Sequence, residues 1–263
     1  MVSDSIFPEK LQTMSNGIEQ ITFNVIGGAF VALLGWGYSK FKEKYINYTF
    51  KQIFGKDAGN NLAITYGKMA LLPCFDEHGK QRKMPYRNKS PNIVFNVSSV
   101  VSFSHTKSIY YLSELFGRIV KTSPRLVSDE EIEEKLDISF CSIGGLNNLK
   151  TRDLLRSDEN TFYDFGETES GMAIISKRDP TSMFGNDVAH DFGFIIKVTP
   201  KNFPNRVWIA VAGLGEWGTT GAMWFLVKNW KKMPKGRSFG MVVKVRGGQD
   251  ESAEVMETLV AND

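Results

Sequence analysis

The feature that most constrains this chain is an uncharged apolar segment close to its start. Residues 21–39 read ITFNVIGGAFVALLGWGYS and carry no charged side chain. At about 1.5 Å per residue, a helix of this length rises roughly 28 Å, which is close to the thickness of the hydrocarbon core of a bilayer. Trp36 and Tyr38 end the segment, and such amphipathic rings favour the membrane interface. We therefore expect residues 21–39 to form a single transmembrane helix.

The charges on either side of this segment predict its orientation. Residues 1–20 carry three acidic side chains and one lysine, whereas four lysines follow the segment: Lys40, Lys42, Lys44 and Lys51. Because basic residues stay on the cytoplasmic side, we expect a protein of the inner (cytoplasmic) membrane, with residues 1–20 outside and the C-terminal part in the cytoplasm. Gly28 and Ala32 put small residues on one helix face, which favours a homo-oligomer in lipid. A buried helix of a soluble domain is the alternative.

Composition excludes several function classes for the rest of the chain. The chain is 42% hydrophobic with a formal net charge of +3, which is too small to indicate nucleic-acid binding. Its two cysteines exclude a disulfide scaffold, and no Cys/His cluster has the spacing of zinc ligands, so we expect no metal and no cofactor. Residues 40–55 predict a juxtamembrane amphipathic helix ended by Gly55, and residues 56–263 predict one cytosolic ligand-binding domain.

Apolar runs alternate with helical patterns along residues 56–263. Predicted strands lie at residues 62–69, 93–103, 138–143, 172–176, 192–198, 207–211 and 239–246. Predicted helices lie at residues 106–120, 147–156 and 219–230, and residues 129–135 read as an acidic, solvent-facing helical segment. Strands interleaved with helices predict an α/β fold, specifically a Rossmann-like three-layer domain preceded by the transmembrane helix. The pattern does not determine the order of the strands.

The most informative segment is VWIAVAGLGEWGTTGAMWFLV, residues 207–227. An apolar strand runs into a glycine-rich turn, and a helix follows. Glycine allows backbone N–H groups to face a ligand, and a helix N-terminus favours a phosphate or carboxylate. The spacing matches neither the dinucleotide-binding fingerprint nor a Walker loop. The candidate ligand-binding residues of this turn are Gly213, Gly215, Gly218, Thr219 and Thr220.

A second strand, within residues 136–155, also ends in glycines, and its candidate ligand-binding residues are Gly144, Gly145, Asn147 and Asn148. Ligands of open α/β sheets bind beyond the carboxyl ends of the strands, so two such turns predict a ligand cleft. His190 directly precedes a strand and is a further candidate contact, with capping of a loop as the alternative. Glu216 and Asp191 are the best-placed catalytic carboxylates, although neither has an identifiable partner.

These motifs carry a family resemblance. The Gly-x-x-Gly-Thr turn at residues 215–219, paired with the earlier Gly-Gly turn, resembles the Rossmann-like SLOG nucleotide-binding superfamily, which includes the Lonely-guy phosphoribohydrolases. An uncharacterised prokaryotic domain family is similar over roughly residues 60–260, at three motifs: Ile143-Gly144-Gly145-x-x-Asn148, Asp191-Phe192-Gly193-Phe194-Ile195 and Ala212-Gly213…Gly218-Thr219. Attached to a membrane helix, such domains resemble nucleotide-sensing effectors of bacterial anti-phage defence. The phosphoribohydrolases carry a Glu shortly after Gly-Thr, and this chain lacks it, so the resemblance implies binding rather than hydrolysis.

Three functions are consistent with these features. The first is a membrane-anchored sensor or effector whose cytosolic domain binds a phosphorylated small molecule, a nucleotide signal, and couples it to oligomerisation or a membrane response. The second is a membrane-tethered hydrolase or glycosidase of nucleotide derivatives that uses Glu216 or Asp191. The third is an interaction scaffold without a ligand, in which the glycines only permit close packing.

Overall fold

The computed structural model describes residues 33–59, 61–70, 74–75, 81–82, 99–169 and 171–261. The chain divides into two compact units, residues 1–48 and residues 49–263. The predicted outer segment 1–20, and residues 21–32 of the predicted transmembrane helix, lie outside the described residues. Across the described ranges, no helix is long and apolar enough to cross a bilayer. The anchor therefore stays a prediction.

Residues 33–54 form a helix that overlaps the predicted juxtamembrane segment 40–55. It ends at Gly55, whose φ of +87° only glycine adopts easily. Within the second unit, Phe50 and Phe54 at the end of this helix are fully buried and pack on Phe116 with ring centroids 4.9 and 5.3 Å away. Trp230 contacts Phe50 edge to face at 5.3 Å. The last turn of the helix is therefore part of the domain core.

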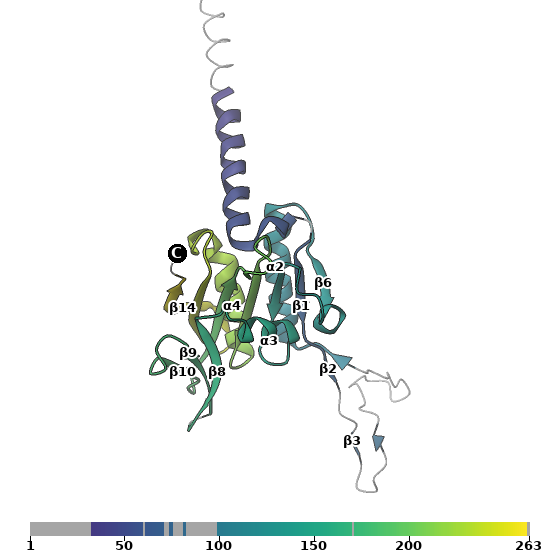
Figure 1. Ribbon diagram of the computed structural model, residues 1–263, viewed down its shortest axis with the longest axis vertical. Helices are drawn as coiled ribbons and strands as arrows, with labels where there is room; N and C mark the ends of the chain where they lie inside the picture. Colours follow the sequence, from purple (N-terminus) through teal and green to yellow (C-terminus); the bar gives the residue numbers. More distant parts are fainter. Residues whose placement is uncertain are drawn as a thin grey trace, which may run out of the picture. The chain divides into compact units, whose positions relative to one another are not determined.

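A seven-stranded mixed sheet forms the centre of the second unit, in the order β14-β13-β11-β12-β7-β1-β6 (Figure 1). Four adjacent strands run parallel: β6 (Arg125–Ser128), β1 (Ala63–Tyr66), β7 (Phe140–Ile143) and β12 (Trp208–Gly213). Antiparallel pairing adds the other three: β11 (His190–Val198), β13 (Phe239–Arg246) and β14 (Gln249–Val260). The predicted α/β fold class is confirmed, with a sheet that is mixed rather than wholly parallel.

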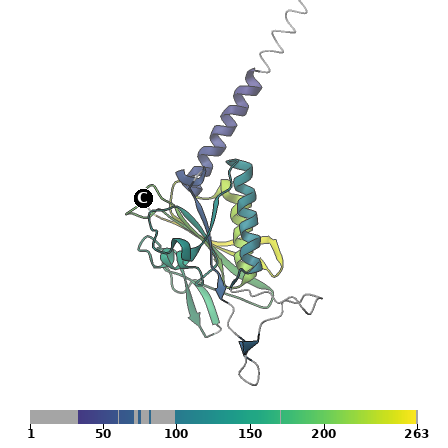
Figure 2. The ribbon, with the colours of Figure 1, turned by 90° about the vertical axis from the view of Figure 1, so that its right-hand side faces the viewer.

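Helices and a small sheet cover the two faces of this sheet (Figure 2). One face carries α2 (Phe103–Ile119) and α4 (Glu216–Asn229), and the other carries α3 (Leu149–Arg156) with a sheet of β8 (Tyr163–Thr168), β9 (Gly171–Ser176) and β10 (Met183–Gly185). Along β11, Phe192 and Phe194 pack in the core on the α3 side, whereas Gly193 between them meets Gly218 of α4. Alternate strand residues point to opposite faces, so β11 serves both layers.

Short elements complete the second unit. They are the 3-10 helices η1 (Lys56–Gly59), η2 (Asp129–Ile132) and η3 (Trp230–Lys232), and the strand pairs β2 (Met69–Ala70) with β5 (Ser99–Val100) and β3 (Cys74–Phe75) with β4 (Gln81–Arg82).

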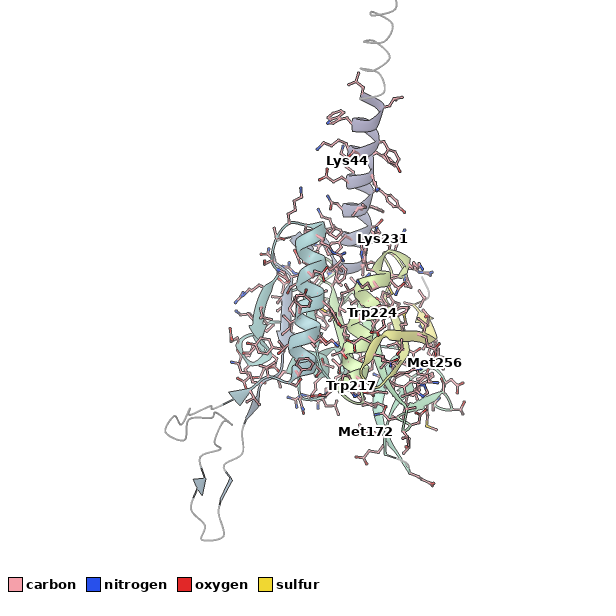
Figure 3. All side chains as sticks on the ribbon, turned by 180° about the vertical axis from the view of Figure 1, so that it is seen from behind. Lys44, Met172, Trp217, Trp224, Lys231 and Met256 are labelled. Carbon is pink, nitrogen blue, oxygen red and sulfur yellow. The ribbon has the colours of Figure 1, made fainter. Side chains whose placement is uncertain are left out.

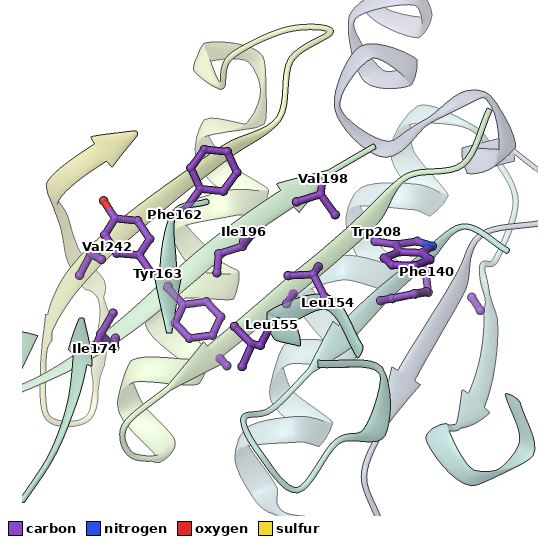
Figure 4. Close-up of a cluster of buried hydrophobic side chains, with 14 of the residues drawn as sticks. Phe140, Leu154, Leu155, Phe162, Tyr163, Ile174, Ile196, Val198, Trp208 and Val242 are labelled. Carbon is purple, nitrogen blue, oxygen red and sulfur yellow. The ribbon is translucent and has the colours of Figure 1, made fainter. Parts of the chain in front are cut away.

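A large apolar cluster lies between the sheet and the layer formed by α3, β8 and β9 (Figure 4). Phe140 of β7 and Trp208 of β12 stack with ring centroids 5.4 Å apart, and Leu154 of α3 lies in the same cluster. On β7 itself, next to Phe140, burial raises the pKa of Cys141 to about 12, so its thiol stays protonated at neutral pH.

A buried lysine fastens the end of the first helix to the sheet. The Nζ of Lys197 on β11 donates to the carbonyl oxygens of Gln52 at 2.8 Å and Arg237 at 3.1 Å. Burial lowers the pKa of Lys197 to about 8, because no water stabilises its charge. A cation at a helix C-terminus interacts favourably with the helix dipole.

Several predicted elements are corrected. Residue 103, placed in a strand over 93–103, begins α2, and residues 93–98 lie outside the described residues. The acidic, aromatic stretch 158–170 contains β8, and β6 and β14 carried no recognised strand signal. The acidic segment 129–135 is not wholly solvent-facing, because Asp129 is buried and accepts the N–H of Leu149 at 2.8 Å.

Candidate functional site

The carboxyl ends of the parallel strands β1, β7 and β12 lie side by side at one edge of the sheet. From β1 the chain passes through α2 to β6 on one side, whereas from β7 it passes through α3 and later reaches β12 on the other side. Neighbouring strands whose connections leave in opposite directions open a crevice beyond their ends, and open α/β sheets bind ligands there. The carboxyl edge formed by β1, β7 and β12 is therefore the region in which a ligand site is sought.

The turn between β7 and α3 is shaped by one glycine and one asparagine. Gly144 has a φ of +100°, and a Cβ at this position would overlap Nε2 of the His105 ring. Asn148 is fully buried, accepts N–H groups of the first turn of α3, and donates to the carbonyl oxygens of Thr65 and Ile143 at 3.1 Å each. Asn148 thus caps α3 and joins β1 to β7. The structure thus shows a structural role for Asn148, and its predicted ligand contact stays a prediction.

The turn between β12 and α4 holds a carboxylate of the chain itself. Asp191, near the start of β11, is buried and accepts the N–H of Gly215 at 3.1 Å and of Gly218 at 2.7 Å. A Cβ on Gly218 would overlap the carbonyl oxygen of Phe192, so glycine allows α4 to approach β11 closely. The positive end of the α4 dipole is met by Asp191. The N–H groups of Gly215 and Gly218 are thus bonded within the chain, and their expected phosphate contact stays a prediction.

Two threonines and a histidine predicted at the site have other partners. The Thr219 hydroxyl donates to the carbonyl oxygen of Gly215 at 3.2 Å, and the Thr220 hydroxyl donates to Oδ1 of the buried Asp250 at 2.8 Å. The Nδ1 of His190 lies 3.0 Å from the carboxylate of Asp187. These three side chains stabilise α4 and the start of β11, and their predicted ligand contacts stay predictions.

A pocket of about 210 Å³ nevertheless lies at the predicted edge, and both glycine turns line it. Gly145 and Asn147 come from the first turn, and Gly213 comes from the second. The other lining residues are His105, Leu146, Phe165, Met172 and Leu214. Met172 and Trp217 are labelled in Figure 3; Met172 belongs to β9, and Trp217 to the first turn of α4. The expected cleft exists, but it is smaller than the predicted residue set implied.

Backbone N–H groups of the first turn are available to a ligand. Within the described part of the chain, no acceptor takes the N–H of Gly145, Leu146 or Asn147. The Cβ of a residue replacing Gly145 would lie 3.3 Å from two atoms of the Phe165 ring, so glycine keeps this wall of the pocket open. Consecutive backbone N–H groups in a turn form a concave site that suits anions.

His105 is the titratable side chain of the pocket wall, and it lies in the first turn of α2. Burial lowers its pKa, while the backbone of Gly67 and the carboxylates of Glu216 and Asp129 oppose this shift. Its Nδ1 is buried without a partner among the described residues. The ring is therefore neutral at pH 7, with one nitrogen free to hydrogen-bond or to take a proton.

Sequence reasoning thus found three of the eight lining residues and missed five: His105, Leu146, Phe165, Met172 and Leu214. In the sequence, His105 lies far from either glycine turn, so only the fold brings it to the pocket. Leu146 and Leu214 stand inside the predicted turns, and their position next to the glycines was the available signal. Among the described residues, no group of three or more His, Cys, Asp or Glu is arranged to hold a metal ion.

The structure shows an α/β protein with a pocket of about 210 Å³ at the carboxyl edge of its sheet. Comparison of the chain with protein-family models, with curated proteins and with solved structures found no match. Function is therefore argued from the site alone.

Proposed function

We propose that this chain is a membrane-anchored sensor or effector whose α/β domain binds a phosphorylated small molecule, a nucleotide signal. The observation that carries the proposal is the convergence of both glycine turns and His105 on one pocket at the carboxyl ends of β7 and β12. The phosphate would accept the N–H groups of residues 145–147, and a base or sugar would pack on Phe165 and Met172. At about 210 Å³ the pocket is smaller than typical ligand sites of about 300–1,000 Å³, so it suits a mononucleotide-sized group that stays partly exposed.

The finer parts of the proposal extend the sequence analysis. The domain is Rossmann-like, the anchor at residues 21–39 places it on the cytoplasmic side of the inner membrane, and ligand binding changes how copies associate. The similarity to SLOG-type defence effectors supports this assignment. A ligand shifts the equilibrium between separate and associated copies only by as much as its binding free energies for these two states differ.

Binding is tested by isothermal titration calorimetry of the full chain in detergent against a panel of linear and cyclic nucleotides. Gly145→Leu fills the pocket wall against Phe165, so it is expected to abolish the binding of any nucleotide that the wild type takes. Gly117→Ala is the matched control, because the added Cβ on α2 meets nothing within 4 Å. No binding by the wild type, or equal affinity in Gly145→Leu, contradicts the proposal.

A hydrolase is the second candidate function, because Glu216 begins α4 shortly after Gly213 and Leu214, which line the pocket. Glu216 opens α4 with an exposed side chain, whereas the Asp191 carboxylate is used by Gly215 and Gly218. Turnover that disappears in Glu216→Gln while binding persists would establish hydrolysis. A ligand-free scaffold predicts instead that no nucleotide raises the thermal midpoint of unfolding.

A further inference from the structure

His105 is the titratable side chain among the residues that line the pocket at the carboxyl edge. Its ring lies against the first glycine turn, because a Cβ on Gly144 would overlap its Nε2. Gly145, Leu146 and Asn147 of the same turn line the pocket beside it. The pocket measures about 210 Å³, so an anion bound there lies close to the imidazole ring.

The empty pocket keeps this ring neutral at pH 7. Burial lowers the pKa of His105, and its Nδ1 is buried without a hydrogen-bond partner in the described part of the chain. A protonated imidazole carries an N–H on both nitrogens. The charged ring would therefore hold a buried N–H group without an acceptor, in a place where little water compensates its charge.

The charges of the domain itself do not reverse this effect. Glu216 of α4 and Asp129 of η2 raise the pKa of His105, but by less than burial lowers it. Asp129 accepts the N–H of Leu149 at 2.8 Å, and Glu216 is exposed to solvent. The two lysines nearest in these segments form salt bridges with other carboxylates, Lys68 with Glu131 at 4.0 Å and Lys107 with Asp250 at 2.7 Å. The ring thus lacks one nearby negative charge that would hold a proton on it.

We propose that an anion bound in this pocket supplies that charge and holds a proton on His105, so that the domain takes up one proton for each anion it binds. The inference rests on the proposed function, which places the phosphate of the ligand at residues 145–147. The proton comes from the solvent and adds to the free nitrogen of the ring, and no other bond forms or breaks.

Proton uptake makes ligand binding depend on pH. A negative charge beside an imidazole raises its pKa, so the liganded domain holds more protons than the empty one near neutral pH. Binding therefore becomes tighter as pH falls from about 7.5 to 6.5, by up to about tenfold per pH unit. Mild acidification thus favours the liganded state of the proposed sensor.

Nuclear magnetic resonance of the full chain in detergent, labelled with ¹³C at Cε1 of histidine, tests the inference. The chain has three histidines, so three resonances are followed against pH and assigned with single His→Gln variants. Sulfate is the probe, because it keeps two negative charges at every pH used, whereas the second pKa of a phosphate is about 6. Relative to sodium chloride of equal ionic strength, sulfate is expected to raise the pKa of His105. The resonance of His190, which does not line the pocket, is expected to respond equally to both salts.

Two variants link this response to the pocket. Gly145→Leu fills the pocket wall against Phe165 and is expected to remove the effect of sulfate on His105. Gly117→Ala adds a Cβ with nothing within 4 Å and is expected to keep it. The sulfate affinity of His105→Gln is expected to be equal at pH 6.5 and 7.5, whereas Tyr110→Gln, an exposed position on the same helix, should keep the wild-type dependence on pH.

The outcomes separate this inference from the proposed function. An equal effect of sulfate in Gly145→Leu, or no effect in the wild type, overturns the inference. If a nucleotide binds and the titration of His105 does not change, the proposed function survives and the inference is overturned. If sulfate raises the pKa of His105 and no nucleotide of the panel binds, the anion site stands and the nucleotide function is lost.

Discussion

The Asp191 carboxylate that caps α4 gives the sharpest test of the site's construction. In Asp191→Ala, the N–H groups of Gly215 and Gly218 lose their acceptor inside the domain, where water does not replace it. A hydrogen bond to a charged group contributes about 1.5–3 kcal/mol, and an N-cap about 1 kcal/mol. Because the two effects overlap, we expect a loss of about 4 kcal/mol in the free energy of unfolding.

That loss corresponds to a fall of roughly 8–16 °C in the thermal midpoint for a domain of this size. Urea unfolding followed by the fluorescence of the buried Trp208 and Trp230 measures it. Asp187→Ala is the matched control, because Asp187 also accepts backbone N–H groups but is exposed, so its loss should stay within about 1 kcal/mol. An Asp191→Ala protein as stable as the wild type, but unable to bind nucleotide, would refute the capping role and return Asp191 to the ligand site.

Three further outcomes are expected. Because the pKa of His105 is lowered in the folded chain, the unfolded chain binds more protons than the folded chain near pH 6, and stability falls as pH drops below about 6.5. In His105→Gln, the urea midpoints at pH 5.5 and 7.5 should therefore lie closer together than in the wild type. In Gly218→Ala the free energy of unfolding should fall by several kcal/mol, because the added Cβ meets the Phe192 backbone. In Gly117→Ala it should rise by up to about 1 kcal/mol, because alanine favours a helix more than glycine does. Thermal scans compare the two variants. Since the pKa of Lys197 is lowered to about 8, stability should rise between pH 8 and 10.5, and Lys197→Met should lose that rise in urea titrations.

The carboxyl-edge cleft was predictable because it follows from local sequence. An apolar run that ends in glycines and continues as a helix predicts a strand, a tight turn and a helix N-terminus, and the ends of β7 and β12 are built in this way. Parallel strands bring such turns to one edge, so Gly145 and Gly213 line one pocket as expected.

The use of the second turn was not predictable. Glycines at a helix N-terminus read equally as a phosphate site or as a close packing contact, and the difference depends on what lies opposite. Asp191 stands 24 residues before Gly215 in the chain, and pairing of β11 with β12 places its carboxylate on the α4 N–H groups. A negative charge of the protein thus occupies the position that the sequence suggested for a ligand.

Strands with mixed or polar surroundings were missed for a similar reason. β14 mixes acidic and apolar residues without a regular alternation, and it lies at the edge of the sheet, paired on one side with β13 among the described strands. β8 belongs to a small sheet that shields the core with few apolar residues of its own.

The sequence by itself determined the α/β class and the glycine turns at the strand ends, because both depend on residues close together in the chain. Only the tertiary structure decided that Asp191 fills the α4 N-terminus and that His105, Phe165 and Met172 complete the pocket. Those contacts join segments that are far apart in the sequence. The order of the strands and the packing of the helices bring these segments together, and no local sequence pattern specifies either.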